Sequence, residues 1–481
     1  MANTHQILIV MISYMTLLIG WGVYQGRKVK SGSDFSIAGR GLPGWAAALS
    51  ERATGESSWA LLGLPGAAYA TGVLELWTAI GCVAGIITAW AALSWRLQKE
   101  AQHYEADTFT DYIAKRHSNQ QKWIRIISSA TIVFFFFFYV GAQFLGGGKA
   151  LHTMFDLEPK TGMLITAAII IPYTIYGGFR SVVYTDVIQA IIMIITLVAG
   201  PIAGIIYLGN HPELFASSIP EALSRAGDSY TSLTGAAGGF GAGIVIVGGF
   251  SWFFGYLGGQ PQLSMRFMAI KDARQAKMAR NIGIVWTLVA YVGALCIGWL
   301  GIAIFGPTGL ADREFVMPSV ILEIFPPAIA AILITGAIAA MISTADSLLI
   351  LSSTELSENL IQPNLKKKLS RKGSLLLSRM LTLGVALIAL SLAYFSSFTS
   401  LIHTLVGYVW AGIGGTFSIV ILFTLFWKKY HGKAVIATII VGMAFTIIWI
   451  STGMEKYFTA KILTFLVAGF TAIIATYIIK D

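Results

Sequence analysis

Apolar stretches of about 20 residues follow one another along almost the whole chain. A membrane-spanning helix needs about 20 apolar residues to cross the hydrocarbon core of a bilayer. Of the 481 residues, 56% are hydrophobic and 12% are charged, which is roughly half the charged fraction of a soluble domain. We therefore predict an all-α polytopic membrane protein with about 13 spans in a lipid bilayer. They are centred on residues 7–26, 45–71, 73–95, 126–153, 160–177, 182–208, 236–259, 282–306, 326–354, 374–396, 399–427, 433–452 and 460–479.

Basic residues are concentrated in the loops that follow odd-numbered spans, whereas acids such as Glu213 and Asp228 dominate the loops after even-numbered spans. The basic set is Arg27, Lys28, Lys30, Arg40, Lys99, Lys115, Arg116, Lys122, Arg125, Arg180, Arg266, Lys271, Arg274, Lys277, Arg280, Lys366, Lys367, Lys368, Arg371, Lys372, Lys428, Lys429 and Lys433. Because basic loops stay in the cytoplasm, we predict an outside N-terminus and a cytoplasmic C-terminus. The same rule explains the net charge of +10, so no nucleic-acid partner is expected. The expected location is the plasma membrane, as in a bacterial inner membrane.

Two connecting segments, residues 98–125 and 209–235, have the polar composition of segments outside the membrane. We predict a short interfacial helix around Thr110–Lys115 in the first and a short helix at Ile219–Arg225, opened by Pro220, in the second. Plain connecting loops remain the alternative for both.

The second apolar stretch is broken by charges and by helix-weakening residues. Within residues 49–66 it contains Glu51, Arg52 and Glu56. Ionisable groups at membrane depth normally face a protein interior or a water-filled cavity, and non-helical backbone is tolerated there only where it lines such a space. We therefore predict an unwound span that forms half of a binding site. A surface loop between two short helices is the alternative. The helix-weakening residues are Gly55, Gly63, Pro65 and Gly66.

A second broken span follows five spans later. Residues 249–261 contain Gly255, Gly258, Gly259 and Pro261 in an apolar run. A pair of Gly/Pro-interrupted spans at matching places in two halves points to an inverted-repeat transporter. We predict a single transporter domain over residues 1–481, in which two five-span repeats are flanked by extra spans. Its parts are 1–44 (first span and loop), 45–208 (first repeat), 236–427 (second repeat) and 428–481 (last two spans).

Span 9 adds a polar helix face. Ala340, Ser343, Thr344 and Ser347 recur at helical spacing, and Asp346 lies beside them. Hard cations prefer oxygen ligands, so this face predicts a sodium site, with helix–helix hydrogen bonding as the alternative reading. Asp186 at the start of span 6 is either a second cation ligand or an anion that stabilises a helix start.

At these residues the sequence resembles the sodium:solute symporter family, most closely its sodium/proline symporter branch. The motifs that carry the resemblance are Leu-Leu-Gly-Leu-Pro-Gly at 61–66, Tyr-Gly-Gly-Phe at 176–179, Tyr-Thr-Asp-Val-Ile-Gln at 184–189, Gln-Pro-Gln-Leu-Ser-Met-Arg-Phe-Met-Ala at 260–269 and Ser-Thr-Ala-Asp-Ser at 343–347. The resemblance implies a LeuT-like five-plus-five fold and sodium (Na+) as the coupling ion. The function to expect is a sodium-coupled secondary active symporter that imports a small polar solute, such as proline or another amino acid.

The resemblance also implies which residues bind ion and solute. A first sodium ion would take the carbonyl oxygens of Ala53, Glu56 and Ala340 and the hydroxyls of Ser343 and Thr344. A second, present in some members, would use Asp186, Ser343, Asp346 and Ser347. The solute would lie among Ser57, Ser58, Trp252, Tyr256, Gln260 and Pro261, with Tyr139 and Gln143 of span 4 as weaker additions.

Three departures from the proline branch affect the expected solute. Gly55 stands where that branch has an aspartate, Glu56 replaces an apolar residue, and Glu51 and Arg52 replace small residues. The same fold could therefore carry a cationic amine paired with Glu56, or couple to protons through Glu56 or Glu51. A transporter-like solute sensor is a further alternative. An enzyme is not expected, because no nucleophile–base pair stands out, and the sequence assigns no oligomeric state.

Overall fold

The computed structural model describes residues 2–27, 37, 41–365, 369–395 and 401–479. Every named element in this part of the chain is a helix, and one isolated bridge joins Leu42 to Ile270. The basic residues Lys28, Lys30, Arg40, Lys366, Lys367 and Lys368, which entered the orientation prediction, lie outside the described residues.

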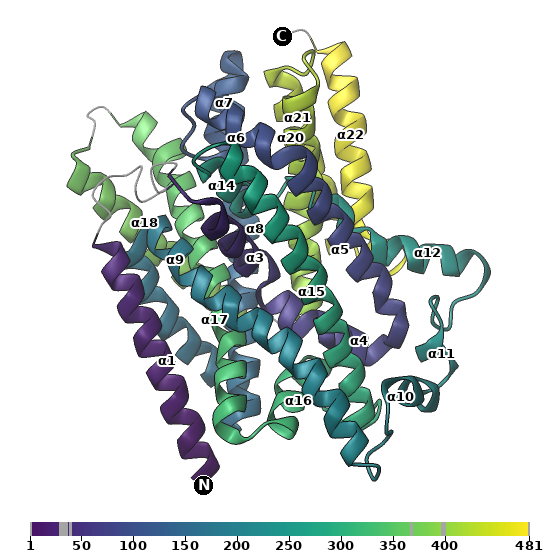
Figure 1. Cartoon of the computed structure of the whole chain (residues 1–481). Coiled ribbons are helices and arrows are strands. Elements are labelled where there is room, and N and C mark those ends of the chain that lie inside the picture. Colours follow the sequence, from purple (N-terminus) through teal and green to yellow (C-terminus); the bar gives the residue numbers. More distant parts are fainter. Residues whose placement is uncertain (1, 28–36, 38–40, 366–368, 396–400, 480–481) are drawn as a thin grey trace.

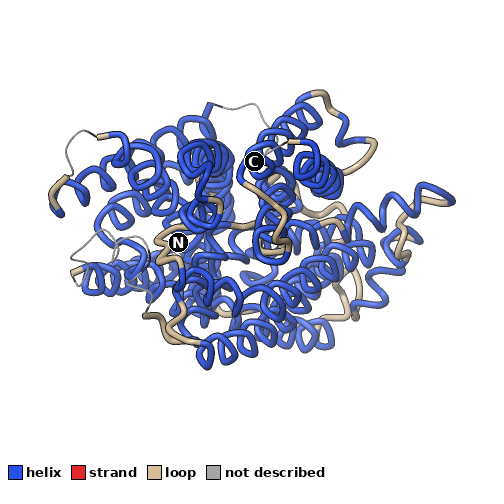
Figure 2. The backbone as a smooth tube through the Cα atoms, turned by 90° about the horizontal axis from the view of Figure 1, so that it is seen from above, coloured by secondary structure: helices blue, strands red, loops and turns tan. Residues whose placement is uncertain are grey.

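The long helices form one bundle, shown in Figure 1 and from above in Figure 2. The α-helices are α1 (Ala2–Gly26), α3 (Gly44–Ser58), α4 (Leu64–Thr71), α5 (Leu76–Thr88), α6 (Ser94–His103), α7 (Phe109–Arg116), α8 (Gln121–Phe155), α9 (Pro159–Asn210), α10 (Ile219–Ala226), α11 (Asp228–Thr231), α12 (Gly239–Phe250), α13 (Trp252–Gly255), α14 (Pro261–Ala269), α15 (Ala273–Phe305), α16 (Val316–Ile324), α17 (Pro327–Thr354), α18 (Arg371–Phe395), α19 (Ile402–Val409), α20 (Thr416–Phe426), α21 (Gly432–Ser451) and α22 (Ala460–Ile478). The π-helical turns are Trp59–Gly63, Ala89–Leu93, Glu355–Ile361 and Trp410–Gly415.

Every predicted span overlaps one or more of these helices. In the described residues, 10 helices are long and apolar enough to cross a membrane, and one of them, Gly44–His103, contains two of the predicted spans. The shorter apolar helices Pro159–Pro172 and Gly239–Gly255 each overlap one further predicted span. The all-helical polytopic class is therefore confirmed, while 13 crossings stays a prediction.

Spans 5 and 6 belong to one long helix with a sharp break. Within α9, Gly178 has φ 64° and ψ 175°. A positive φ of this kind is strained for residues with a Cβ and accessible to glycine. The break therefore separates two helical legs without a connecting loop, at the boundary that the sequence predicts between residues 177 and 182.

Span 7 differs from the prediction, because its first half lies across the bundle. Figure 1 shows α12 projecting from the side of the molecule, at a steep angle to the long helices. Its 12 residues extend roughly 18 Å, which is too short to cross the hydrocarbon core. It packs on α5, and Gly249 permits this contact, since a Cβ there would lie 2.7 Å from Trp77 Cβ.

The two ends of the chain lie at opposite ends of the bundle (Figure 1), as an odd number of crossings requires. The helices α6, α7 and α14 lie toward the end where the C-terminus is marked, and α10 lies toward the other end. The predicted short helices at 110–115 and 219–225 are confirmed as α7 and α10. Helix α16 has no counterpart in the predictions. In the bundle centre α3 packs against α9, α15 and α17, and this contact region contains the site described next.

Candidate functional site

The first broken helix changes direction at a serine. Ser57, inside α3, has φ 49° and ψ −162°, a backbone region that is nearly exclusive to glycine, and such strain is typical of functional sites. Two residues of α8 hold the distorted segment. Tyr139 donates its hydroxyl to Ser57 Oγ at 3.2 Å, and Gln143 Oε1 accepts from the backbone N–H of Ser58 at 3.1 Å. The structure therefore brings together four of the predicted solute residues.

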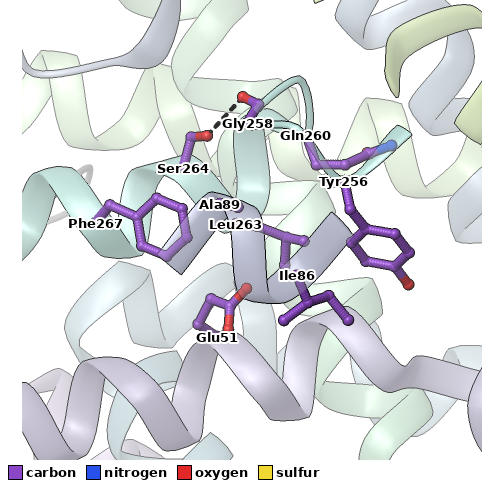
Figure 3. A pocket seen from close by; sticks show the side chains of 9 residues that line it. All are labelled: Glu51, Ile86, Ala89, Tyr256, Gly258, Gln260, Leu263, Ser264 and Phe267. Atoms are coloured by element: carbon purple, nitrogen blue, oxygen red, sulfur yellow. Dashed lines mark hydrogen bonds between the residues drawn. The ribbon is translucent and has the colours of Figure 1, made fainter. Parts of the chain in front are cut away.

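The second broken helix is interrupted over residues 256–260, between α13 and α14. Pro261 begins α14, where its missing N–H costs nothing. Gly258 has φ 80°, and its carbonyl accepts from Ser264 Oγ at 2.8 Å, as Figure 3 shows. Gly255 lies against Trp410 so closely that a Cβ there would be 2.5 Å from the indole ring. The break therefore places the backbone of this span directly against the π-helical turn of span 11.

Aromatic rings join the two broken helices. Trp59 and Trp252 stack with ring centroids 4.1 Å apart and an interplanar angle of 12°. Trp410 lies 5.4 Å from Tyr139 and 5.3 Å from Tyr256, ring centre to ring centre. The sequence predictions include Trp252, Tyr139 and Tyr256 but not Trp59 or Trp410. The position of Trp59 inside the predicted unwound segment 49–66 is the sequence signal that could have included it.

A small cavity lies beside the second break. Figure 3 shows that Tyr256, Gln260 and Leu263 approach it from one side and Glu51 from α3 on the other. Its free space is on the order of one water molecule. All the predicted solute residues are buried in this structure.

The residues predicted for the first sodium ion lie where α3 meets α17. Thr344 donates its hydroxyl to the carbonyl oxygen of Thr54 at 3.1 Å, and Ser343 donates to Asp186 Oδ1 at 2.5 Å. Ala53 and Ala340 are fully buried on the two helices. The set therefore lies on two facing helices.

Glu56 belongs to the same set, and its two kinds of oxygen have different surroundings. Its carbonyl oxygen accepts from the N–H of Trp59. In the part of the chain that the structure describes, its carboxylate Oε2 is buried and has no hydrogen-bond partner. The carboxylate belongs to the ion cluster of Arg52, whereas the sodium prediction uses the carbonyl oxygen.

A fully buried ion cluster surrounds Arg52, in the first broken helix. The guanidinium pairs with Glu51, and Nε donates to Glu51 Oε2 at 2.5 Å. Nη1 donates to Glu56 Oε1 at 2.9 Å and to Thr287 Oγ1 at 3.1 Å. Trp90 Nε1 also donates to Glu51, at 3.1 Å. The charges that the sequence placed at membrane depth are therefore paired inside the protein.

The residues predicted for a second sodium ion gather around another arginine. Arg266 Nη2 lies 3.2 Å from Asp186 Oδ2 and 2.6 Å from Ser347 Oγ. Asp346 is fully buried on the same helix as Ser347 and interacts electrostatically with Arg266. Sequence reasoning assigned Arg266 only to a basic loop, whereas it is 1% exposed. Its place in the motif at 260–269 was the available signal.

A further ion cluster, in which Lys149 and Glu314 are buried, lies at the C-terminal part of α8. Lys149 of α8 pairs with Asp312 and Glu314, each at 2.6 Å. Glu314 also accepts from the backbone N–H groups of Ile402 and His403, at 3.1 and 3.0 Å. The cluster therefore holds the start of α19 against α8.

Replacing Lys149 by Met is expected to lower the free energy of unfolding by about 1–3 kcal/mol, because the buried Glu314 loses its counter-ion but keeps two backbone N–H donors. The Lys149→Met, Glu314→Gln double variant should recover part of that loss. Thermal unfolding of the purified protein measures both. A Lys149→Met melting temperature equal to that of the wild type would show that this cluster does not stabilise the fold.

The comparisons with known proteins identify the family of the chain. A model of the sodium:solute symporter family matches residues 35–442. The chain is 33% identical over 444 residues to the osmoregulated proline transporter OpuE of Bacillus subtilis (92% of this chain, 87% of the relative). It is 32% identical over 458 residues to the sodium/proline symporter of Escherichia coli (93% and 88%). The chain therefore belongs to the sodium:solute symporter family.

Two solved structures resemble the fold. A Na+-coupled sialic acid symporter superposes with a TM-score of 0.81 at 18% identity, covering 99% of this chain and 98% of that one. The nucleobase-cation-symport-1 transporter MHP1 gives a TM-score of 0.57 at 13% identity, covering 93% and 94%. The LeuT-like five-plus-five fold with two broken helices is thus confirmed. The protein is a multi-pass, sodium-coupled secondary active symporter of a small solute, and not an enzyme.

Proposed function

We propose that this symporter imports proline, driven by sodium ions that move into the cell. The single observation that carries the proposal is the convergence of Ser57, Ser58, Tyr139 and Gln143 at a strained helix break, in a family whose similar members are named proline transporters. The proposed location is a bacterial plasma membrane, with the N-terminus outside and the C-terminus in the cytoplasm.

The sodium ion would bind between α3 and α17. The hydroxyls of Ser343 and Thr344 and the carbonyl oxygens of Ala53, Glu56 and Ala340 are its proposed ligands, because a hard cation prefers oxygen. With ligands on both helices, a bound ion would hold α17 against the broken span.

The solute would bind between the two broken helices. Its polar groups would meet Ser57, Ser58, Tyr139 and Gln143 on one side, and its ring would meet Trp252, Tyr256, Gln260 and Pro261 on the other. The Trp59–Trp252 stack would have to open first. Sodium would favour the outward-open state, solute would favour closure, and rocking of one repeat against the other would release both inside.

Replacing Trp252 by Ala should raise the proline concentration for half-maximal uptake about tenfold, because an aromatic contact of this kind contributes about 1–1.5 kcal/mol. Uptake at several proline concentrations gives this value. The matched control is Trp449→Ala, a tryptophan of α21 that donates to Phe458 O and is not assigned to the site. Equal effects of the two substitutions would remove Trp252 from the solute site.

The purified protein allows a direct test of ligand identity. A ligand that binds only the folded state raises the melting temperature by mass action. We expect proline to raise it in sodium salts and not in potassium or choline salts. A proline effect of equal size in all three salts would contradict sodium coupling.

A second candidate solute is a small cationic amine. It is favoured by Glu51, whose carboxylate lines the small cavity beside Tyr256 and Gln260, and by the unpaired oxygen of Glu56. The same thermal-shift panel separates the two, since amines without a carboxylate should then stabilise the protein more than proline does.

A further inference from the structure

Lys461 places a cation beside the proposed solute site. It lies in the first turn of α22, a helix outside both predicted five-span repeats, and its side chain is partly buried. Its Nζ lies over the indole ring of Trp252, 5.0 Å from the ring centroid, where the ring attracts a positive charge. Trp252 also stacks on Trp59. Helix α22 therefore adds a positive charge to the aromatic group that joins the two broken helices.

A glycine allows the ammonium and the indole to lie together. Gly407 of α19 is close to both groups, since a Cβ there would be 3.5 Å from Lys461 Nζ and 3.7 Å from Trp252 Cζ2. Helix α22 packs on α13, which begins with Trp252, and on the π-helical turn of span 11. The ammonium therefore lies among the elements that form the solute side of the second broken helix.

The ammonium has no carboxylate as an ion-pair partner among the described residues. Its one hydrogen bond in this part of the chain goes to Thr459 Oγ1, at 3.2 Å. The buried cations Arg52, Arg266 and Lys149, by contrast, each pair with a carboxylate. Taking a charge out of water without a counter-ion is costly. The ammonium of Lys461 is thus available to an anion.

The two acidic residues nearest in effect to this ammonium have other partners. Glu455 accepts from the backbone N–H of Ala460 at 2.7 Å, and Glu75 Oε1 lies 3.6 Å from His403 Nε2. Both carboxylates attract Lys461, but at a range longer than that of an ion pair. A carboxylate that enters with a ligand can therefore form the direct contact that these two do not make.

We infer that Lys461 binds the carboxylate of the transported solute, so that the solute is an amino acid and not an amine without a carboxylate. The inference deepens the proposed function and rests on it in placing the solute beside Trp252. Because the ammonium and the indole are adjacent, the ring of proline can lie against Trp252 while its carboxylate forms a charge-assisted hydrogen bond with Lys461. The same positive charge repels an amine that carries no carboxylate.

The test compares proline with prolinamide, which keeps the ring and the amine but has a neutral carboxamide in place of the carboxylate. Isothermal titration calorimetry of the purified full chain in sodium salts gives both dissociation constants. We expect the wild type to bind proline at least about tenfold more tightly, as is typical for a hydrogen bond to a charged group. Lys461→Met should bind proline about tenfold more weakly and prolinamide as the wild type does, whereas Lys461→Arg should keep the preference for proline.

The matched control is Lys160→Met. Lys160 also lies in the first turn of its helix, α9, with Nζ 5.1 Å from the ring centroid of Tyr394, and it is not assigned to the solute site. Both dissociation constants should equal those of the wild type. Without solute, Lys461→Met should melt no lower than the wild type, because the lysine it removes has no counter-ion. Lys461→Gln provides a second neutral variant where the methionine variant does not fold.

Equal weakening of proline and prolinamide binding by Lys461→Met would show a structural role for the lysine and overturn the inference. Equal binding of the two ligands by the wild type would overturn it as well. A wild type that binds neither ligand contradicts the choice of proline in the proposed function. The same comparison between other amino acids and their amides then decides the inference, and binding of amines alone would overturn it.

Discussion

Replacing Arg52 by Met should lower the free energy of unfolding by about 3–5 kcal/mol, the cost typical of removing one partner from a buried ion cluster. The substitution leaves the carboxylates of Glu51 and Glu56 facing each other without the guanidinium that contacts both. All three side chains are at most 2% exposed, so water cannot replace the lost partner. Thermal unfolding in detergent measures the effect.

The matched control removes all three charges. The triple variant Glu51→Gln, Arg52→Met, Glu56→Gln should be much closer to the wild type in stability, because replacing a whole buried ion cluster by neutral groups is often nearly neutral. If the single and triple variants are destabilised equally, the loss reflects packing of the arginine side chain and not its charge.

Changing Ser343 and Thr344 together to Ala should raise the sodium concentration for half-maximal uptake at least about tenfold, since it removes two of the proposed oxygen ligands. It also removes the Thr344 hydrogen bond to the backbone of α3. Solute uptake measured over a range of sodium concentrations gives the value.

The matched control for this variant is Ser353→Ala. That serine is buried on the same helix, α17, and in the described part of the chain its hydroxyl donates only to Ile350 O of its own helix. Its sodium dependence should equal that of the wild type. An unchanged sodium dependence in the double variant would refute the proposed ion site.

Much of the fold could be predicted because membrane spans are encoded by length and hydropathy alone. The runs of apolar residues predict each long helix, and the short helices α7 and α10 follow from local signals such as Pro220. The orientation of α12 could not be predicted. Its apolar, glycine-rich sequence suits a membrane helix, and only its packing on α5 sets its direction.

The exact positions of the helix breaks were also only partly predictable from the sequence. Gly55, Gly63 and Pro65 mark the first broken span in the sequence, but the backbone breaks at Ser57. Tertiary contacts with Tyr139 and Gln143 hold the serine in this strained conformation, so no local propensity predicts it. The second break was easier to predict, because Gly258 has a positive φ that favours glycine and Pro261 is the first residue of α14.

For the site, residue types predicted which side chains offer oxygen ligands but not which side chains contact one another. Asp186, Ser343 and Ser347 were recognised as oxygen donors from spacing and resemblance. Arg266 comes from a segment about 80 residues away from both Asp186 and Ser347, and it fills the space between them. This placement depends on the packing of four helices. Trp59 and Trp410 were missed for the same reason, since aromatic residues in apolar spans usually pack into the core.

The most direct test of sodium-coupled proline symport is uptake of labelled proline into proteoliposomes that contain only this protein. An inward sodium gradient should drive accumulation of proline above the external concentration, and an inside-negative potential should increase it, because each charge gains about 2.3 kcal/mol per 100 mV. Equal accumulation under a proton gradient without sodium, or none under a sodium gradient, would contradict the account.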